Sequence, residues 1–156
     1  MSIPLRLRAK HRIASIAMTA LLTATLGLAG CSSMGHTSQP TLYSQLGGEK
    51  GISLVVHAFV LNVAHDQRIN ARFAHVNIPH LEAQLTAFFC QETGGPQVYT
   101  GPDMYAVHKG MHITNAQWTA FMTDFELTLK QEKVPQLQQA QLLGLLEPMK
   151  SEIVGK

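Results

Sequence analysis

The chain has 156 residues, which is enough for one ordinary domain with its own core. Four of its 12 basic residues and none of its 10 acidic residues lie in the first thirty positions, so the rest of the chain carries 8 basic against 10 acidic residues. Because residues 31–156 are slightly acidic, they lack the broad positive charge that is typical of nucleic-acid-binding domains. We therefore expect no nucleic-acid partner.

The first thirty residues have the pattern of an export signal. A basic region ends at Arg12, an apolar run rich in Ala, Leu and Thr covers 13–28, and small residues lead to Cys31. An apolar run of this length with a small-residue end is typical of a cleaved signal peptide and is too short for a spanning helix. We therefore predict a signal peptide over residues 1–30.

The sequence Leu28-Ala29-Gly30-Cys31 resembles a bacterial lipobox. The resemblance implies a lipoprotein-type signal, with cleavage before Cys31 and acylation that anchors the protein to a membrane facing the periplasm. Ser32 resembles sorting signals for the outer membrane, and the polar residues 31–40 are predicted to form a flexible tether. Two alternatives stay open: an ordinary signal peptide followed by a cysteine, and translation from Met34, which would give a cytoplasmic protein.

Residues 41–156 are predicted to form one helical domain. Thr41 precedes a short turn over 42–46, and Gly47-Gly48 separate this turn from a long helical pattern. Apolar residues at helical spacing define the buried face of that long helix. They are Ile52, Val55, Val56, Phe59 and Val63.

A second long helix is expected after a polar connection. Residues 66–70 are predicted to form a turn, and Phe73 lies in a short irregular stretch. Asn77, with Pro79 two residues later, is a signal for a helix start. The apolar face of this helix comprises Leu81, Leu85, Phe88 and Phe89.

Glycine and proline end this second helix at Gly94-Gly95-Pro96, and a loop continues through Pro102. Asp103 is expected to cap a very short helix that reaches His108, and Gly110 is expected to end it. The pattern thus places a histidine on a short helix behind a long glycine- and proline-containing loop.

Two more helices complete the domain. Thr114 and Gln117 have the spacing of a capping box at the start of a long helix. The apolar face of that helix comprises Trp118, Phe121, Met122, Phe125 and Leu129. Pro135 starts the last helix, and Pro148 inside it is expected to produce a kink. Its apolar face comprises Leu142, Leu145, Leu146, Met149 and Ile153. No segment alternates like a strand, so the fold class is all-α.

Four segments, in this order and at this spacing, resemble the group I truncated haemoglobins. They are Leu42-Tyr43-Ser44-Gln45-Leu46-Gly47-Gly48-Glu49, Ala87-Phe88-Phe89-Cys90, Gly94-Gly95-Pro96-Gln97-Val98-Tyr99-Thr100-Gly101 and Met104-Tyr105-Ala106-Val107-His108-Lys109-Gly110-Met111. The resemblance extends from Thr41 to about Val154. It implies a truncated globin over 41–156 with a two-over-two helical sandwich, and a haem b group bound without a covalent link. The chain has no C-x-x-C-H motif for covalent attachment, and Cys90 is expected to be a buried, non-catalytic thiol.

The resemblance further implies that His108 is the ligand of the haem iron. Neutral imidazole is a good iron ligand, and its second nitrogen usually donates to a carbonyl that fixes the ring. Phe73 matches the phenylalanine that packs on the haem face. Other residues expected to supply apolar walls are Phe59, Leu81, Leu85, Phe89 and Phe125. The other histidines of the domain are expected at the surface or satisfied within the core: His57, His65, His75, His80 and His112.

The distal side departs from the family pattern. Many members carry a tyrosine directly after the phenylalanine that matches Phe59, whereas this chain has Val60. Many also carry a glutamine where this chain has Leu85. Leu81 matches the usual distal gate, and Gln84 is the nearest remaining polar side chain. Because both donors are replaced by apolar groups, we expect a pocket that discriminates poorly in favour of oxygen.

These residues favour a reversible binder of oxygen, carbon monoxide and nitric oxide rather than an enzyme. The alternative is a haem redox enzyme in nitric oxide detoxification, as a dioxygenase, or in peroxidase-like chemistry. That activity would need an external electron-donor protein, because the chain has no G-x-G-x-x-G motif for a nicotinamide or flavin cofactor. A third possibility is a helical lipoprotein without haem, against which His108 and its flanking loop argue.

Overall fold

The computed structural model describes residues 39–156. The predicted signal peptide, Cys31 and most of the predicted tether lie outside the described residues. The helices of the described part are α1 (Leu42–Gln45), α2 (Gly48–His65), η1 (Asn70–Phe73), α3 (Ile78–Glu92), α4 (Met104–His108), α5 (Asn115–Gln131), α6 (Gln136–Leu146), η2 (Glu147–Met149) and α7 (Lys150–Ile153), where η denotes a 3-10 helix. Between residues 39 and 156 there is no β-strand, only an isolated bridge between Ile113 and Val154. The all-α fold class is therefore confirmed.

Side-chain caps fix where three of the helices begin. The side chain of Asn77 accepts a hydrogen bond from a backbone N–H in the first turn of α3 at 3.1 Å, and Asp103 does the same for α4 at 2.7 Å. Thr114 and Gln117 form a reciprocal capping box at the start of α5. Each cap satisfies an N–H group that helix geometry leaves free. The start signals in the sequence are thus confirmed.

Two helix boundaries differ in detail from the sequence expectation. Gly48 is already the first residue of α2, while α1 ends at Gln45. The glycine pair has φ angles of 85° and 68°, so the chain changes direction within the pair. The kink expected at Pro148 takes the form of η2, which separates α6 from α7. Proline has no N–H group with which to continue α-helical bonding.

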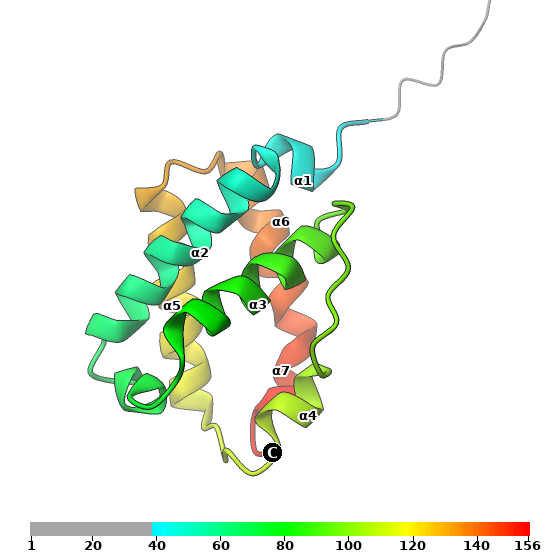
Figure 1. The fold of residues 1–156 in the computed structure, drawn as a ribbon. Helices are drawn as coiled ribbons and strands as arrows, with labels where there is room; N and C mark the ends of the chain where they lie inside the picture. Colours follow the sequence, from blue (N-terminus) through cyan, green and yellow to red (C-terminus); the bar gives the residue numbers. More distant parts are fainter. Residues whose placement is uncertain (1–38) are drawn as a thin grey trace, which may run out of the picture. The chain divides into compact units, whose positions relative to one another are not determined.

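The helices pack in two layers. In Figure 1, α2 and α3 lie in front, and α5 and α6 lie behind them. Aromatic rings join the layers: Phe59 of α2 meets Phe125 of α5 edge-on with ring centroids 5.2 Å apart, and Phe89 of α3 stacks on Phe125 at 5.3 Å. Aromatic pairs of this geometry add to the stability gained from apolar burial. This arrangement is the two-over-two helical sandwich that the family resemblance implies.

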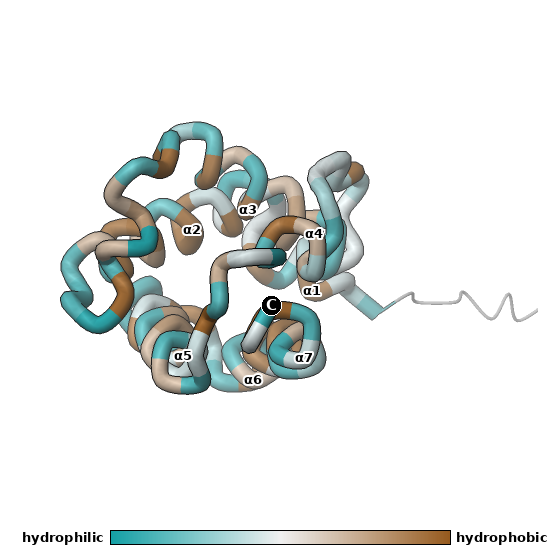
Figure 2. Tube along the Cα trace, turned by 90° about the horizontal axis from the view of Figure 1, so that it is seen from below, coloured by the Kyte–Doolittle hydropathy of each residue, from teal (hydrophilic) through white to brown (hydrophobic). Residues whose placement is uncertain are grey.

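The C-terminal residues lie beside α4, which contacts α7. The backbone N–H of His112 donates to the carbonyl of Lys156 at 2.6 Å, and that of Gly155 donates to the carbonyl of Ile113 at 2.9 Å. In Figure 2 the C-terminus lies between α4 and α7, the two elements that contact each other. The segment after α4 is thus anchored to the end of the chain. Within residues 39–156, no helix is both long enough and apolar enough to span a membrane.

Candidate functional site

The loop that leads to α4 and His108 starts from the end of α3, which is packed against α1. Gly94 has a φ of 84°, a left-handed conformation that favours glycine. At Gly95, an added Cβ atom would lie 2.5 Å from the ring of Tyr43, so a larger residue would displace that ring. The Tyr43 N–H also donates to the carbonyl of Thr93 at 2.9 Å. The end of α3 therefore packs on α1, and the loop starts from a fixed point.

His108 is the last residue of α4 and is partly buried. Its ring nitrogen Nδ1 lies 2.8 Å from the carbonyl oxygen of Met104, so Nδ1 carries the hydrogen and donates it. Within residues 39–156, that bond is the ring's only hydrogen bond. In the neutral form of the ring this bond leaves the lone pair of Nε2 free, and the Met104 carbonyl fixes its direction. This is the orientation that a metal-ligating imidazole needs.

The three predicted distal residues of α3 lie on one helix face. Leu81, Gln84 and Leu85 are spaced i, i+3 and i+4, and all three are partly buried. Phe73 ends η1 and is partly buried against the core. On α2, Val60 is buried, with 6% of its surface exposed. The two positions at which the family pattern has polar donors are therefore apolar and shielded from solvent in whole or in part.

The structure brings the remaining predicted residues together as core. Phe59, Phe89 and Phe125 are each almost fully buried. Phe59 also meets Phe121 edge-on at a centroid distance of 4.9 Å. Sequence reasoning assigned Phe121 to the apolar face of its helix but did not include it in the site. The Phe59–Phe121 contact makes Phe121 a partly exposed extension of this aromatic core.

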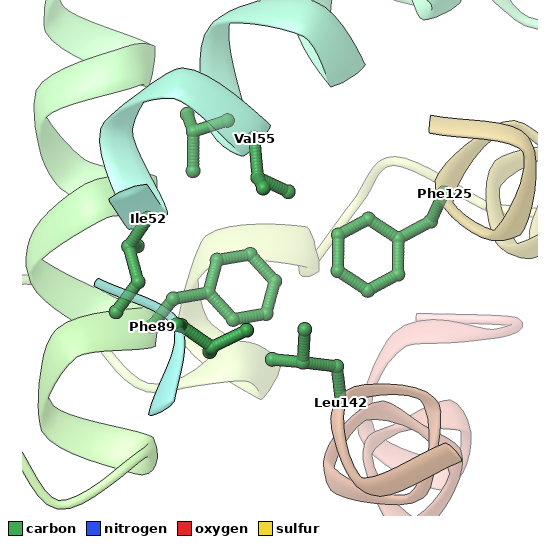
Figure 3. A pocket seen from close by; sticks show the side chains of 7 residues that line it. Ile52, Val55, Phe89, Phe125 and Leu142 are labelled. Carbon is green, nitrogen blue, oxygen red and sulfur yellow. The ribbon is translucent and has the colours of Figure 1, made fainter. Parts of the chain in front are cut away.

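Two of these rings line a small internal cavity. Phe89 and Phe125 meet Leu142 of α6 there (Figure 3), and Leu46, directly after α1, and residues of α2 close the other sides. The cavity volume is about 10 Å³, which is close to the space of one water molecule. Its lining is entirely apolar, so the core is closely filled at this point.

A polar cluster that sequence reasoning missed joins the connection after α2 to α5. The guanidinium of Arg68 donates from Nε to both oxygens of Asp66 at 2.9 Å and 2.8 Å, but it reaches Oδ1 of the buried Asp124 only at 3.4 Å. Burial first, and the nearby Asp66 charge second, raise the pKa of Asp124 to about 6. The hydrogen bonds from Arg68 lower the pKa of Asp66 to about 2. The cluster therefore holds one carboxylate and one carboxyl group that protonates readily.

The residues present fit haem, which needs apolar surfaces and one ligating imidazole. Phe73, Leu81, Leu85 and Phe121 pack against the core but keep part of their apolar surface uncovered. His108 adds one nitrogen with a free lone pair. In the described part of the chain, no three His, Cys, Asp or Glu side chains gather as a metal-ion site. One available imidazole beside apolar surfaces is the set of groups that haem requires from a protein.

Comparison with known proteins decides the family. The family model of the bacterial-like globins matches residues 41–154. The chain belongs to the bacterial-like globin family. The group 1 truncated hemoglobin of Tetrahymena pyriformis is 30% identical over 116 residues, which cover 74% of this chain and 96% of that protein. A group 1 truncated hemoglobin of Synechocystis is 35% identical over 100 residues, covering 62% and 81% of the two chains.

Solved structures agree with this membership. The crystal structure of the Tetrahymena pyriformis truncated hemoglobin in its Fe(III) form has a TM-score of 0.71 and 30% identity, covering 75% of this chain and all of the other. The 2/2 hemoglobin of Synechococcus, at 22% identity and a TM-score of 0.71, shares the fold. Membership of this family gives the truncated globin the family's general role, which is to bind haem and small gases.

Proposed function

We propose that this truncated globin binds haem b without a covalent link, holds the iron through Nε2 of His108, and binds diatomic gases reversibly. The observation that carries the proposal is the bond from His108 Nδ1 to the Met104 carbonyl, which fixes the ring and leaves Nε2 free. The name of the Tetrahymena relative, a truncated hemoglobin 30% identical to this chain, supports the same cofactor.

Haem supplies an iron atom on which small gases bind reversibly, and the surrounding side chains set how strongly each gas is held. Phe73 would pack on the haem face, and Leu81 and Leu85 would cover the distal side. These apolar groups exclude water from the pocket. Phe59, Phe89 and Phe125 support the walls from within the core.

The distal side would favour gases that need no hydrogen bond. Val60 and Leu85 are apolar at the positions where many relatives have a donor, and Gln84 is the nearest polar side chain. A hydrogen bond to a polarised partner contributes about 1.5–3 kcal/mol, and about 1.4 kcal/mol corresponds to a factor of ten in affinity. Oxygen should therefore be held one to several orders of magnitude more weakly than with two donors, while carbon monoxide and nitric oxide should lose less.

Haemin titration of the purified full chain tests the proposal. We expect a one-to-one Soret band that shifts on reduction with dithionite and again with carbon monoxide. A His108→Gly variant should lose the wild-type spectrum, and added imidazole should restore it by occupying the vacated ligand position. His80→Ala, an exposed histidine on α3, is the matched control and should resemble the wild type. No stoichiometric binding by the wild type, or a His108→Gly spectrum equal to it, would contradict the proposal.

For localisation, we propose an exported protein with a lipid anchor at Cys31. The support is the basic, apolar and lipobox pattern of residues 1–31. In a bacterial host, labelled fatty acid should enter the wild-type protein and a Cys90→Ala control, and both should sediment with membranes. A Cys31→Ser variant should take up no label. Equal labelling of the Cys31→Ser variant, or labelling of none of the three proteins, would overturn the anchor.

A further inference from the structure

Arg72 joins two segments that are far apart in the sequence. It lies in η1, directly before Phe73. Its Nη1 donates to the backbone carbonyl of Met111 at 2.7 Å, and its Nη2 donates to Oε1 of Gln117 at 3.1 Å. Met111 follows α4, and Gln117 lies in the first turn of α5. One guanidinium therefore holds the connection between α4 and α5 against the connection between α2 and α3.

Both ends of this bridge are themselves fixed. The backbone N–H of Met111 donates to the carbonyl of His108 at 3.0 Å. Arg72, which donates to the carbonyl of Met111, is therefore bound to the turn that directly follows the histidine. Oε1 of Gln117 also accepts a hydrogen bond from the N–H of Thr114 at 3.0 Å, as part of the capping box of α5. The bridge therefore ends on atoms that are themselves hydrogen-bonded, one of them in the turn directly behind His108.

The bonding of Arg72 differs in kind from that of the other arginine in the same connection. Arg68 pairs with the carboxylates of Asp66 and Asp124, whereas Arg72 donates to two neutral oxygens. Arg68 bonds chiefly to Asp66, which is only two residues away. The two bonds of Arg72 join its planar guanidinium to a distant segment, and they fix both distance and direction relative to it. Lysine carries the same charge but cannot reproduce the planar fork.

From this geometry we infer that Arg72 is a positioning residue of the haem site: through Met111 and Gln117 it sets the position of the His108 turn relative to Phe73. The inference rests on the proposed role of His108 as the iron ligand. Phe73 and His108 would contact the haem from two different segments, and Arg72 is the side chain that connects those segments directly. Loosening this bridge should change both the iron–histidine bond and the retention of haem.

The test compares Arg72→Lys and Arg72→Met with Arg68→Lys and Arg68→Met in the full chain loaded with haem. We expect the Arg72 variants to shift the iron–histidine stretching band in resonance Raman spectra of the reduced protein. Transfer of haem to an acceptor globin should become about threefold to tenfold faster, as expected for the loss of one net hydrogen bond. The Arg68 variants should lower the stability of the fold but leave the band in place.

A second arm strengthens the bridge. Gln117→Glu keeps a residue that suits a capping box and gives Arg72 a carboxylate partner. Haem loss should slow in this variant, and the gain should vanish when Arg72→Met is added. In the haem-free protein, amide hydrogen exchange of residues 109–112 should be faster in Arg72→Met than in Arg68→Met, which reports the bridge without any haem signal.

The outcomes separate the inference from the proposed function. If wild type binds no haem, or its spectrum does not depend on His108, the proposed function fails and the inference falls with it. If wild type shows the histidine band and neither Arg72 variant moves it, the inference alone is wrong. It is also wrong if the Arg68 and Arg72 variants shift the band equally, because a general loss of stability would then account for the effect.

Discussion

Position 85 is a place where a hydrogen-bond donor can be added to the proposed distal face of α3, beside Gln84. Leu85 is partly buried and close in size to glutamine, so Leu85→Gln adds a donor with little change in volume. We expect oxygen dissociation from the haem-loaded protein to slow about tenfold or more, because one bond to a polarised partner contributes about 1.5–3 kcal/mol. Carbon monoxide dissociation should change less. Stopped-flow ligand replacement measures both rates.

Leu85→Met is the control for that prediction, since it changes the shape of the side chain without adding a donor. Its oxygen dissociation rate should stay near that of the wild type. Equal slowing in Leu85→Met and Leu85→Gln would point to packing as the cause and contradict an apolar distal side as the reason for weak oxygen binding.

Asp124 should make the stability of the fold depend on pH. Its pKa is raised to about 6 by burial and by Asp66, so between pH 4 and 6 the folded state keeps a proton that the unfolded chain releases. The free energy of unfolding should therefore fall as pH rises through this range, by up to about 3 kcal/mol. Asp66 has the opposite effect at lower pH, because Arg68 stabilises its ionised carboxylate in the folded state. This contribution to the free energy of unfolding is complete above about pH 4 and is lost as pH falls towards 2.

Asp124→Asn should remove the fall between pH 4 and 6. Urea unfolding of variant and wild type at a series of pH values measures the difference, in which the titration of all other groups largely cancels. Glu126→Gln, at an exposed carboxyl on the same helix that pairs with Lys130, is the matched control and should keep the fall between pH 4 and 6. A wild-type slope that survives in Asp124→Asn would show that another group titrates.

How well single residues could be predicted depends on how local their partners are. His108 stands in a short motif, so the sequence alone indicates this residue and predicts that a backbone carbonyl binds its second nitrogen; the structure shows that this carbonyl is that of Met104, one helical turn away. Arg68 and Asp124 are 56 residues apart, and Arg72 and Met111 are 39 apart. No periodicity or motif links positions at such separations, so these contacts became visible only in the folded chain.

Among the elements, α5 depends most clearly on its cap. The hydroxyl oxygen of Thr114 accepts a hydrogen bond from the backbone N–H of Gln117, and the side-chain oxygen of Gln117 accepts one from the backbone N–H of Thr114. Thr114→Ala should lower the free energy of unfolding by about 1 kcal/mol, because one N–H in the first turn loses its partner. Chemical denaturation measures the change. Thr100→Ala, an exposed threonine in the loop before α4, should have almost no effect; a similar loss in both variants would contradict a specific role for the cap.

Helix boundaries were largely predictable because their signals lie within four residues of one another. Asn77, Asp103 and Thr114 each cap the helix that the sequence assigns to them. The proline at position 148 could be predicted to disturb the last helix, but the form of the disturbance depends on how the flanking residues pack. Leu146 and Ile153 are both buried, and η2 keeps these two side chains in the core while the bonding pattern changes between them.

At the scale of the whole molecule, Phe125 joins the two layers. It contacts Phe59 and Phe89 and is 1% exposed. Phe125→Ala should lower the free energy of unfolding by about 3–5 kcal/mol, because the ring leaves a cavity that its neighbours fill only in part. Thermal and urea unfolding measure the loss. Leu127→Ala, on the same helix but 46% exposed, should cost far less, and a comparable cost there would contradict a special place for Phe125.

The pairing of helices into two layers was not contained in the apolar periodicity, which shows only which face of each helix is buried. The two-over-two arrangement came from the resemblance of four segments to truncated haemoglobins, and the structure confirms it. The roles of Phe73, Leu81 and Gln84 remain predictions, because they depend on where haem and a bound gas would lie, which the fold of the chain alone does not define.

Cys90 is 0% exposed in α3, and burial, followed by the charge of Glu49, raises the pKa of its thiol. Thiol reagents and disulfides react with exposed thiolates, so the buried thiol of Cys90 is unreactive while the domain is folded. Its labelling in a Cys31→Ser chain can therefore proceed only through excursions that uncover α3. The rate of that labelling measures how often this local unfolding occurs. Comparing the rate with and without haem would show how much the cofactor suppresses local unfolding of the domain.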